Sequence, residues 1–196
     1  MDSATKRGAA KLERRAELIA AAGELFGRLG FSHVSLEDLG AQVGISGPAV
    51  YRHFPNKAAV LATLLVEVSE GLLSGGQRVV RAGGTPQEVL EKLVDFHTDF
   101  AFSSPDVIRI QDREWRFLDE ENLQRVRQLQ KAYISLWAAQ LEQVHPDESA
   151  SDALFRAHSV FGLLNSTPHT VSGSGTKVTA RKKLLSQMAV AALLTP

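Results

Sequence analysis

Residues 35–57 read SLEDLGAQVGISGPAVYRHFPNK, and this stretch contains two short helical patterns joined by a glycine turn. Ser35 and Asp38 resemble a capping box with Asp in place of Glu, which predicts the start of the first helix. Gly44 predicts its end, because glycine readily adopts the left-handed backbone that often follows a helix. The apolar face of this helix is formed by Leu36, Leu39 and Val43.

The second short helix is predicted over residues 47–54. Ser46 is placed to cap it, and Pro48 stands in the first turn, where a missing backbone N–H does no harm. The helix is expected to end before Pro55, because proline disfavours a helical conformation in the residue that precedes it. Two short helices with a glycine-containing turn between them are typical of a helix-turn-helix.

Longer helices are predicted on both sides of this motif. Residues 9–29 carry one apolar stripe at helical spacing, and Gly30 is placed to stop that helix. Asn56 is placed to cap a further helix over roughly residues 57–73. The sequence therefore predicts an N-terminal three-helix unit followed by a long helix that leads away from it.

The remainder of the chain also carries helical patterns, and we find no strand-like alternation of useful length. We expect an all-α protein of about nine helices, in which a helical bundle follows the helix-turn-helix domain. Residues 74–86 are the predicted connection between these two parts, and residues 169–175 are a predicted flexible loop. The other expected helices cover residues 86–102, 105–117, 119–144, 148–166 and 176–194.

Composition excludes several classes of protein. The chain has 196 residues, 44% of them apolar, which suits a folded domain rather than a disordered one. It contains no cysteine, so disulfides and cysteine-based sites are excluded. No close histidine pair has metal-site spacing, and no phosphate-binding loop or nucleophile motif occurs. We therefore expect no metal, no cofactor and no enzyme activity.

The sequence also bears on the location of the protein. The first residues lack the apolar segment of a secretory signal, and no apolar run approaches the ~20 residues that span a bilayer. We expect a cytoplasmic protein with no membrane partner.

Charge is balanced over the whole chain but not along it. Residues 1–57 hold eight Lys or Arg and six Asp or Glu, although the net charge of the protein is zero. Five cations lie between Lys6 and Arg15, and a basic arm ahead of a folded domain is one sign of nucleic-acid contact. A solvated tail with no such role is the alternative reading of the same charges.

The chemistry of residues 47–54 suits the second helix of a helix-turn-helix, which lies in the major groove. Gly47, Pro48 and Ala49 are small, as needed where a helix approaches the groove floor. Tyr51 and His53 offer donors to phosphate oxygens, and Arg52 can reach a phosphate or a guanine. The alternative is that Tyr51 and His53 are half-buried helix residues with satisfied polar tips. Val50 and Phe54 are expected to point inward.

The stretch SLEDLGAQVGISGPAVYRHFPNKAAVL resembles the DNA-binding signature of TetR-type (TetR/AcrR) transcriptional regulators, and the resemblance extends over about residues 10–62. It implies that residues 1–56 bind DNA, and that residues 57–196 bind a small molecule and dimerise through the last two helices. It also implies a repressor that binds a palindromic operator as a homodimer and is released by a small-molecule effector. The DNA-binding residues carried over by position, or placed in the same segment, are Ser35, Ser46, Gly47, Pro48, Ala49, Tyr51, Arg52, His53 and Lys57.

One position departs from the family pattern. Glu37 stands where some members have a basic residue that reads a base. A carboxylate cannot bind guanine in that way, so it either accepts a hydrogen bond from a cytosine amino group or avoids the DNA.

A ligand site is expected where aromatic and polar residues mix in the middle helices, because small-molecule pockets combine apolar walls with a few polar groups. His158, Phe161 and Asn165 are predicted to share one helix face. An arginine stripe could receive an anion or could be neutralised by nearby acids. The segments QDREWRFL and FGLLNSTPH resemble actinobacterial TetR-type regulators near acyl-CoA and fatty-acid genes, which implies an acyl-CoA or other acyl effector. The candidate ligand residues are Phe96, Phe100, Arg109, Arg113, Trp115, Trp137, His158, Phe161 and Asn165.

Two other functions compete with a ligand-responsive regulator. One is a helical small-molecule-binding protein or enzyme whose helix-turn-helix is only structural, and the missing catalytic motifs count against the enzyme. The other is an architectural DNA binder, which the neutral net charge disfavours.

Overall fold

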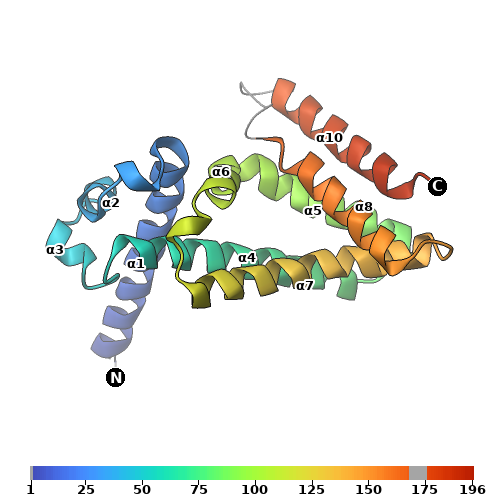
Figure 1. The fold of residues 1–196 in the computed structure, drawn as a ribbon. Coiled ribbons are helices and arrows are strands. Elements are labelled where there is room, and N and C mark those ends of the chain that lie inside the picture. The colour runs from blue at the N-terminus through green and yellow to red at the C-terminus, as the bar shows by residue number, and fades with distance from the viewer. Residues whose placement is uncertain (1, 168–175) are drawn as a thin grey trace. The chain divides into compact units, whose positions relative to one another are not determined.

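The computed structural model describes residues 2–167 and 176–196, and every regular element within them is a helix (Figure 1). This confirms the all-α fold, whereas the loop predicted at residues 169–175 lies outside the described residues. The elements are α1 (Asp2–Leu29), the 3₁₀ helix η1 (Phe31–His33), α2 (Leu36–Gln42), α3 (Gly47–Val50), α4 (Lys57–Arg81), α5 (Pro86–Ser103), α6 (Pro105–Arg113), the 3₁₀ helix η2 (Trp115–Phe117), α7 (Glu120–Val144), α8 (Ala150–Leu164) and α10 (Thr176–Leu194).

The chain folds into two compact units. The first unit contains the chain up to Glu67 together with Asp106–Arg125, and the second contains Val68–Pro105 and Val126–Pro196. These are packing units. The predicted functional division at residue 56 concerns DNA and ligand binding and stays a prediction.

The core of the first unit joins α1 to the helix-turn-helix. α2 and α3 pack closely at Gly40, where a Cβ atom would lie 2.8 Å from Val50 Cγ2. Val50 and Phe54 are almost completely buried, which confirms that they point inward. The other fully buried side chains of this core include Leu18, Phe26, Leu39, Leu61 and Leu65.

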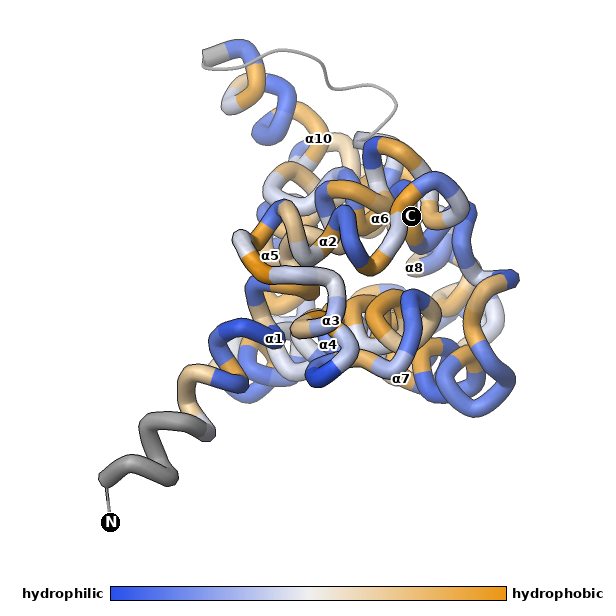
Figure 2. Tube along the Cα trace, turned by 90° about the vertical axis from the view of Figure 1, so that its left-hand side faces the viewer, coloured by the Kyte–Doolittle hydropathy of each residue, from blue (hydrophilic) through white to orange (hydrophobic). Residues whose placement is uncertain are grey.

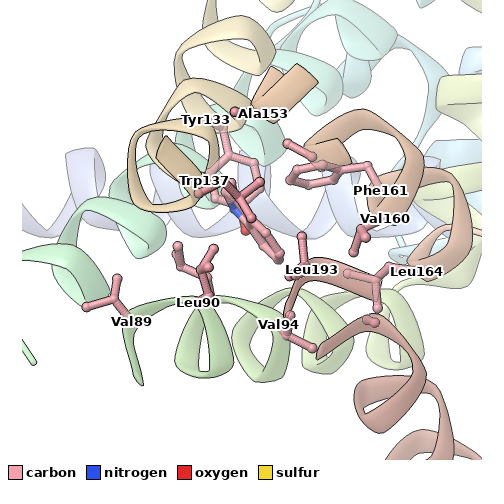
Figure 3. Close-up of a cluster of buried hydrophobic side chains, with 14 of the residues drawn as sticks. Val89, Leu90, Val94, Tyr133, Trp137, Ala153, Val160, Phe161, Leu164 and Leu193 are labelled. Carbon is pink, nitrogen blue, oxygen red and sulfur yellow. The ribbon is translucent and has the colours of Figure 1, made fainter. Parts of the chain in front are cut away.

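The core of the second unit is aromatic at its centre. Figure 3 shows Tyr133 and Trp137 of α7 facing Phe161 of α8, with Leu90 and Val94 of α5 beside them. α10 packs against both α5 and α8 and closes this core with Ala189 and Leu193. Leu72 of α4 belongs to the same cluster, so five helices bury one continuous apolar core.

Helix boundaries follow the local signals closely. Ser35 and Asp38 form a complete capping box, and Thr85 and Glu88 form a second one at the start of α5. Gly30, just after α1, has a φ of 85°, which favours glycine at that position. The helix predicted at residues 105–117 is divided instead: α6 ends at Arg113 and η2 follows.

The predicted connection at residues 74–86 is wrong for most of its length, because α4 continues as a helix to Arg81. A Cβ atom on Gly75 would lie 2.1 Å from Phe96 Cζ, and one on Gly76 would lie 2.6 Å from Tyr133 Cε2. These glycines allow aromatic rings to pack directly on the helix backbone rather than ending the helix. The connection is reduced to the few residues around Gly83 and Gly84, both of which have positive φ.

α4 is the one described helix whose length and composition would suit a membrane span. In this fold 44% of its most apolar stretch is buried within the protein, where Val60, Leu61 and Leu65 lie in the core. Core helices of proteins pass the same test of length and composition.

Candidate nucleic-acid interface and ligand site

The recognition segment, residues 46–54, is one helical turn followed by tight turns rather than the predicted two-turn helix. α3 itself covers Gly47–Val50. The N–H groups of Arg52 and His53 then bond three residues back, to Ala49 and Val50 respectively. Ser46 occupies the N-cap position as predicted, but its side chain makes no capping hydrogen bond.

The recognition segment presents the predicted DNA-binding side chains on one exposed stretch of chain. Ser46, Pro48, Tyr51 and Arg52 are exposed, and Tyr51 keeps 54% of its surface accessible. Gly47, Ala49 and His53 are half-buried. The Tyr51 hydroxyl and the Arg52 guanidinium are hydrogen-bond donors, which phosphate oxygens and base edges can accept.

The two ring nitrogens of His53 lie in different surroundings. Its Nδ1 is buried and has no hydrogen-bond partner among the described residues, which leaves Nε2 as the ring nitrogen available to a phosphate. Burial lowers the pKa of His53 first, and the nearby cations Lys11, Arg15, Arg14 and Arg52 lower it further. The imidazole is therefore neutral at neutral pH, and Nε2 can act as donor in the corresponding tautomer.

Ser35 acts as the cap of α2. Its hydroxyl accepts a 3.1 Å hydrogen bond from the Asp38 N–H and donates one of 2.7 Å to the Asp38 carboxylate. The backbone hydrogen bond from Ser35 lowers the pKa of Asp38, and the Ser35 hydroxyl and the charge of Lys57 add to this. Ser35 is half-buried, so the predicted contact beside the DNA backbone would be made from this capped position.

Lys57 has a partner inside the protein. Its Nζ donates a 2.6 Å hydrogen bond to the carbonyl of Phe31 and lies 4.4 Å from the centre of the Phe31 ring. The predicted phosphate contact by Lys57 would have to share the ammonium with this carbonyl.

The predicted basic arm divides into two parts. Arg14 donates to the Val43 carbonyl and pairs with Glu17, while Arg15 bonds residues of the recognition segment and α4. These two cations are therefore built into the fold, although charge pattern alone grouped them with the arm. Lys11 is exposed, and the side chains of Lys6 and Arg7 lie outside the described residues.

Glu37 lies beside the first turn of α3. A Cβ atom on Gly47 would be 3.0 Å from Glu37 Cγ and 3.4 Å from its Oε1. The carboxylate is exposed, so the acid stands on the same surface as the small residues that lead the recognition segment.

A polar cluster lies inside the second unit. His97 Nε2 is 3.0 Å from Asn165 Oδ1, and the Tyr133 hydroxyl is 3.4 Å from His97 Nδ1. Because the amide oxygen can only accept, Nε2 donates and Nδ1 accepts from the tyrosine. Burial lowers the pKa of His97 to about 4, against the opposing effect of Asn165. Burial also raises the pKa of Tyr133.

Two of the predicted ligand residues pack around this cluster. The Phe161 ring lies 4.7 Å from the His97 ring and 4.8 Å from that of Trp137. Trp137 Nε1 is buried and makes no hydrogen bond of normal geometry among the described residues. It lies near Tyr133 and lowers the pKa of that residue, against the larger effect of burial. His97 and Tyr133 are missing from the predicted set, and the only signal for His97 is its helical spacing from Phe100.

Two further predicted ligand residues line an open groove. Phe96 and Phe100 of α5 face Val68 and Leu72 of α4 across a space of about 480 Å³. Gly71, Asp99, Ser103 and Ser104 complete its walls. The groove is mostly apolar and has a carboxylate and hydroxyl groups along its edge.

The structure does not bring the remaining predicted ligand residues into this set. His158 is exposed, and its Nδ1 lies 2.9 Å from the Leu154 carbonyl, whereas Phe161 is buried, so the two residues do not share a buried face. Arg109, Arg113 and Trp115 belong to the first unit. Arg109 pairs with Asp106 at 2.5 Å, so an acid neutralises part of the predicted arginine stripe.

An apolar face remains exposed on α8 and α10. Phe155 keeps 73% of its surface accessible, Leu184 keeps 56% and Met188 keeps 48%. α10 begins with hydrophilic residues and ends with apolar ones (Figure 2). Within residues 2–167 and 176–196, no group of three His, Asp or Glu side chains could hold a metal ion.

Comparison with known sequences and structures matches both halves of the chain. Residues 18–64 match the family described as bacterial regulatory proteins, tetR family, and residues 83–179 match a tetracyclin repressor-like C-terminal domain. The nucleoid occlusion factor SlmA of Vibrio vulnificus (strain YJ016) is 30% identical over 124 residues, which cover 62% of this chain and 63% of that protein. The match therefore spans less than two thirds of that relative.

Two solved structures share the fold over nearly the whole chain. A TetR-family transcriptional regulator from Bordetella parapertussis 12822 has a TM-score of 0.82 at 23% identity, covering 92% of this chain and 94% of its own. AibR in complex with isovaleryl coenzyme A and operator DNA has a TM-score of 0.76 at 19% identity, covering 93% and 99%.

Proposed function

This chain belongs to the TetR family of DNA-binding transcriptional regulators, and we propose that it is a repressor that binds a palindromic operator as a homodimer and leaves it when a small-molecule effector binds. It would act in the cytoplasm, on double-stranded DNA. Residues 1–56 would bind the operator, and residues 57–196 would bind the effector and form the dimer.

The recognition segment is the observation that supports operator binding. Val50 and Phe54 fix it to the core, while Tyr51, Arg52 and the Nε2 edge of His53 remain available to a partner. In this proposal Tyr51 and His53 bind phosphates, and Arg52 reads a base together with Pro48 and Ala49. Residues 1–57 carry only two more cations than anions, so one subunit would bind weakly and two would be needed.

The exposed apolar face of α8 and α10 supports the homodimer. Phe155 of α8 and Leu184 and Met188 of α10 present large apolar side chains to solvent. The small exposed residues Ser159 and Gly162 follow Phe155 on α8 at helical spacing. A second copy of this face would bury both surfaces and give the two-fold symmetry that a palindromic operator mirrors.

The groove at Phe96 and Phe100 supports an effector with an elongated apolar part. Its size suits a small molecule, and its polar edge could bind a head group. The structural relative solved with isovaleryl coenzyme A binds an acyl thioester, so an acyl-CoA panel is the first to test. The melting temperature should rise for at least one chain length, and this rise should be lost in Phe100→Ala. No response at any chain length would exclude acyl effectors.

Binding to DNA selected from a random-sequence duplex library tests the operator proposal. Tyr51→Ala should weaken binding to the selected duplex by at least tenfold at unchanged melting temperature, because it removes an exposed phosphate donor. Leu12→Ala, an exposed residue of α1, is the matched control and should bind like the wild type. Wild-type protein that selects no sequence, or Tyr51→Ala that binds normally, would contradict the proposal.

A second candidate function follows from the 30% identity to SlmA, namely nucleoid occlusion. A dedicated regulator should occupy a few promoters, whereas an occlusion factor should occupy many chromosomal sites and disturb cell division when deleted. Chromatin immunoprecipitation with tagged protein separates the two.

A further inference from the structure

Two adjacent arginines of α1 contact the carboxyl-terminal ends of both helices in the helix-turn-helix. The Arg14 guanidinium donates a 2.9 Å hydrogen bond to the carbonyl of Val43, which follows α2. The Arg15 guanidinium donates one of 3.2 Å to the carbonyl of His53, in the turns that follow α3. The last carbonyls of a helix lack partners within it, so a cation there satisfies an acceptor and favours the helix dipole.

Arg15 makes two further contacts. Its second terminal nitrogen donates a 3.1 Å hydrogen bond to Thr63 Oγ1 in α4, and its guanidinium carbon lies 4.3 Å from the centre of the Phe54 ring. One half-buried side chain therefore links α1, the end of the recognition segment and α4. The planar guanidinium suits this task because it stacks on a ring while its edge donates to two acceptors, which an ammonium does not do.

These contacts leave little of Arg15 for DNA. Both of its terminal nitrogens already have acceptors, and one face of the guanidinium plane is against Phe54. Its carbonyl partner belongs to His53, the residue whose Nε2 is the available phosphate donor. Movement of Arg15 would therefore move His53 and the end of the recognition segment.

We propose that Arg15 is a positioning residue that fixes the recognition segment for operator binding and does not itself neutralise a phosphate. This inference rests on the proposed function, since the segment must bind DNA for its position to matter. Arg15→Lys is the decisive variant: lysine keeps the charge that a phosphate contact needs but cannot make the three contacts together.

The experiment uses the full-length protein, a duplex selected by the wild type and a scrambled duplex of equal length. Arg15→Lys should weaken binding to the selected duplex by at least tenfold and should leave binding to the scrambled duplex unchanged. Arg15→Gln should weaken specific binding similarly without changing the slope of log affinity against log salt concentration. A phosphate contact would instead lower that slope by about 0.9 per subunit.

Two further variants keep the test decisive. Arg28→Lys changes an exposed α1 arginine in the same way and should bind like the wild type. Thr63→Val removes one acceptor of Arg15 without touching a cation, so it should reduce specific binding in the same direction even if the Arg15 variants do not fold. The proposal would be overturned by wild-type affinity in Arg15→Lys, or by a lowered slope of log affinity against log salt concentration in Arg15→Gln. If the Arg15 variants do not fold, wild-type affinity in Thr63→Val would overturn it.

Amide hydrogen exchange of the free protein separates this inference from the proposed function. Arg15→Lys should speed exchange at His53 and Phe54, whose N–H groups bond to Val50, whether or not DNA is bound. Unchanged exchange would contradict the positioning role. Wild-type protein that selects no DNA sequence would contradict the proposed function itself.

Discussion

Lys57 Nζ lies 2.6 Å from the carbonyl oxygen of Phe31, at the start of the helix that follows the recognition segment. The N–H of the same Phe31 donates to the buried carboxylate of Glu114 at 3.2 Å. The Phe31 ring packs against Phe26 and Phe117 at 5.2 and 4.4 Å between centres. Phe31 is thus bound through its carbonyl, its N–H and its ring by three parts of the first unit.

Replacing Lys57 should destabilise the protein whether or not Lys57 touches DNA. Lys57→Met removes a charge-assisted hydrogen bond and a cation–π contact, so we expect a loss of about 1–2 kcal/mol in the free energy of unfolding by urea. Lys11→Met, which changes an exposed lysine, should be neutral. Wild-type stability in Lys57→Met would contradict this expectation. A slope of log DNA affinity against log salt concentration that is lowered by about 0.9 per subunit in this variant would support the predicted phosphate contact.

Glu37 should influence which base pair the operator carries at one position in each half-site. Glutamate accepts hydrogen bonds from cytosine N4, whereas glutamine prefers adenine, so Glu37→Gln should shift the selected base from cytosine to adenine. Gly47→Ala should weaken the preference without changing any charge, because its Cβ would displace Glu37. Selection from a random duplex library measures both, and identical selected sequences would show that Glu37 avoids the DNA.

His97 should make stability fall in mildly acidic solution. Its pKa is about 4 in the folded protein and near 6.5 in the unfolded chain, so the unfolded state takes up a proton as pH falls through this window. We expect the wild type to lose about 2 kcal/mol more than His97→Gln between pH 7.5 and pH 5, from urea unfolding. Equal losses in the two proteins would show that another group is responsible.

Gly76 and Gly71 should respond in opposite ways to the same substitution. Gly76→Ala places a Cβ atom 2.6 Å from the ring of the buried Tyr133, so we expect a loss of about 1–3 kcal/mol. Gly71 lies in the same helix, and a Cβ atom added there would meet no neighbour within 4 Å, so Gly71→Ala should stabilise by about 0.5–1 kcal/mol. Thermal unfolding measures both, and a stabilised Gly76→Ala would contradict the close approach.

Features set by neighbouring residues could be predicted from the sequence. The capping box at Ser35 and the positive φ at Gly30 depend on residues a few positions away, and the inward positions of Val50 and Phe54 follow from their spacing of four residues. The helix starts at Pro86 and Pro105 were predicted for the same reason, because the residue before each one is a typical cap.

Features set by distant residues could not be predicted in this way. Arg15 bonds to partners 38 and 48 residues away, and charge pattern alone placed it in a DNA-binding arm. The glycines of α4 were interpreted as a linker because the rings of Phe96 and Tyr133 approach them only in the folded protein. His158 and Phe161 are three residues apart, yet the packing of α8 buries only the phenylalanine.

The glycine pair of α4 also restricts how that helix can move. Two aromatic rings occupy the volume of two absent side chains, so a turn of α4 about its own axis would drive neighbouring Cβ atoms into Phe96 and Tyr133. Within the second unit, rotation of α4 about its axis therefore requires both rings to move. A conformational change in this unit must carry both rings along with the helix.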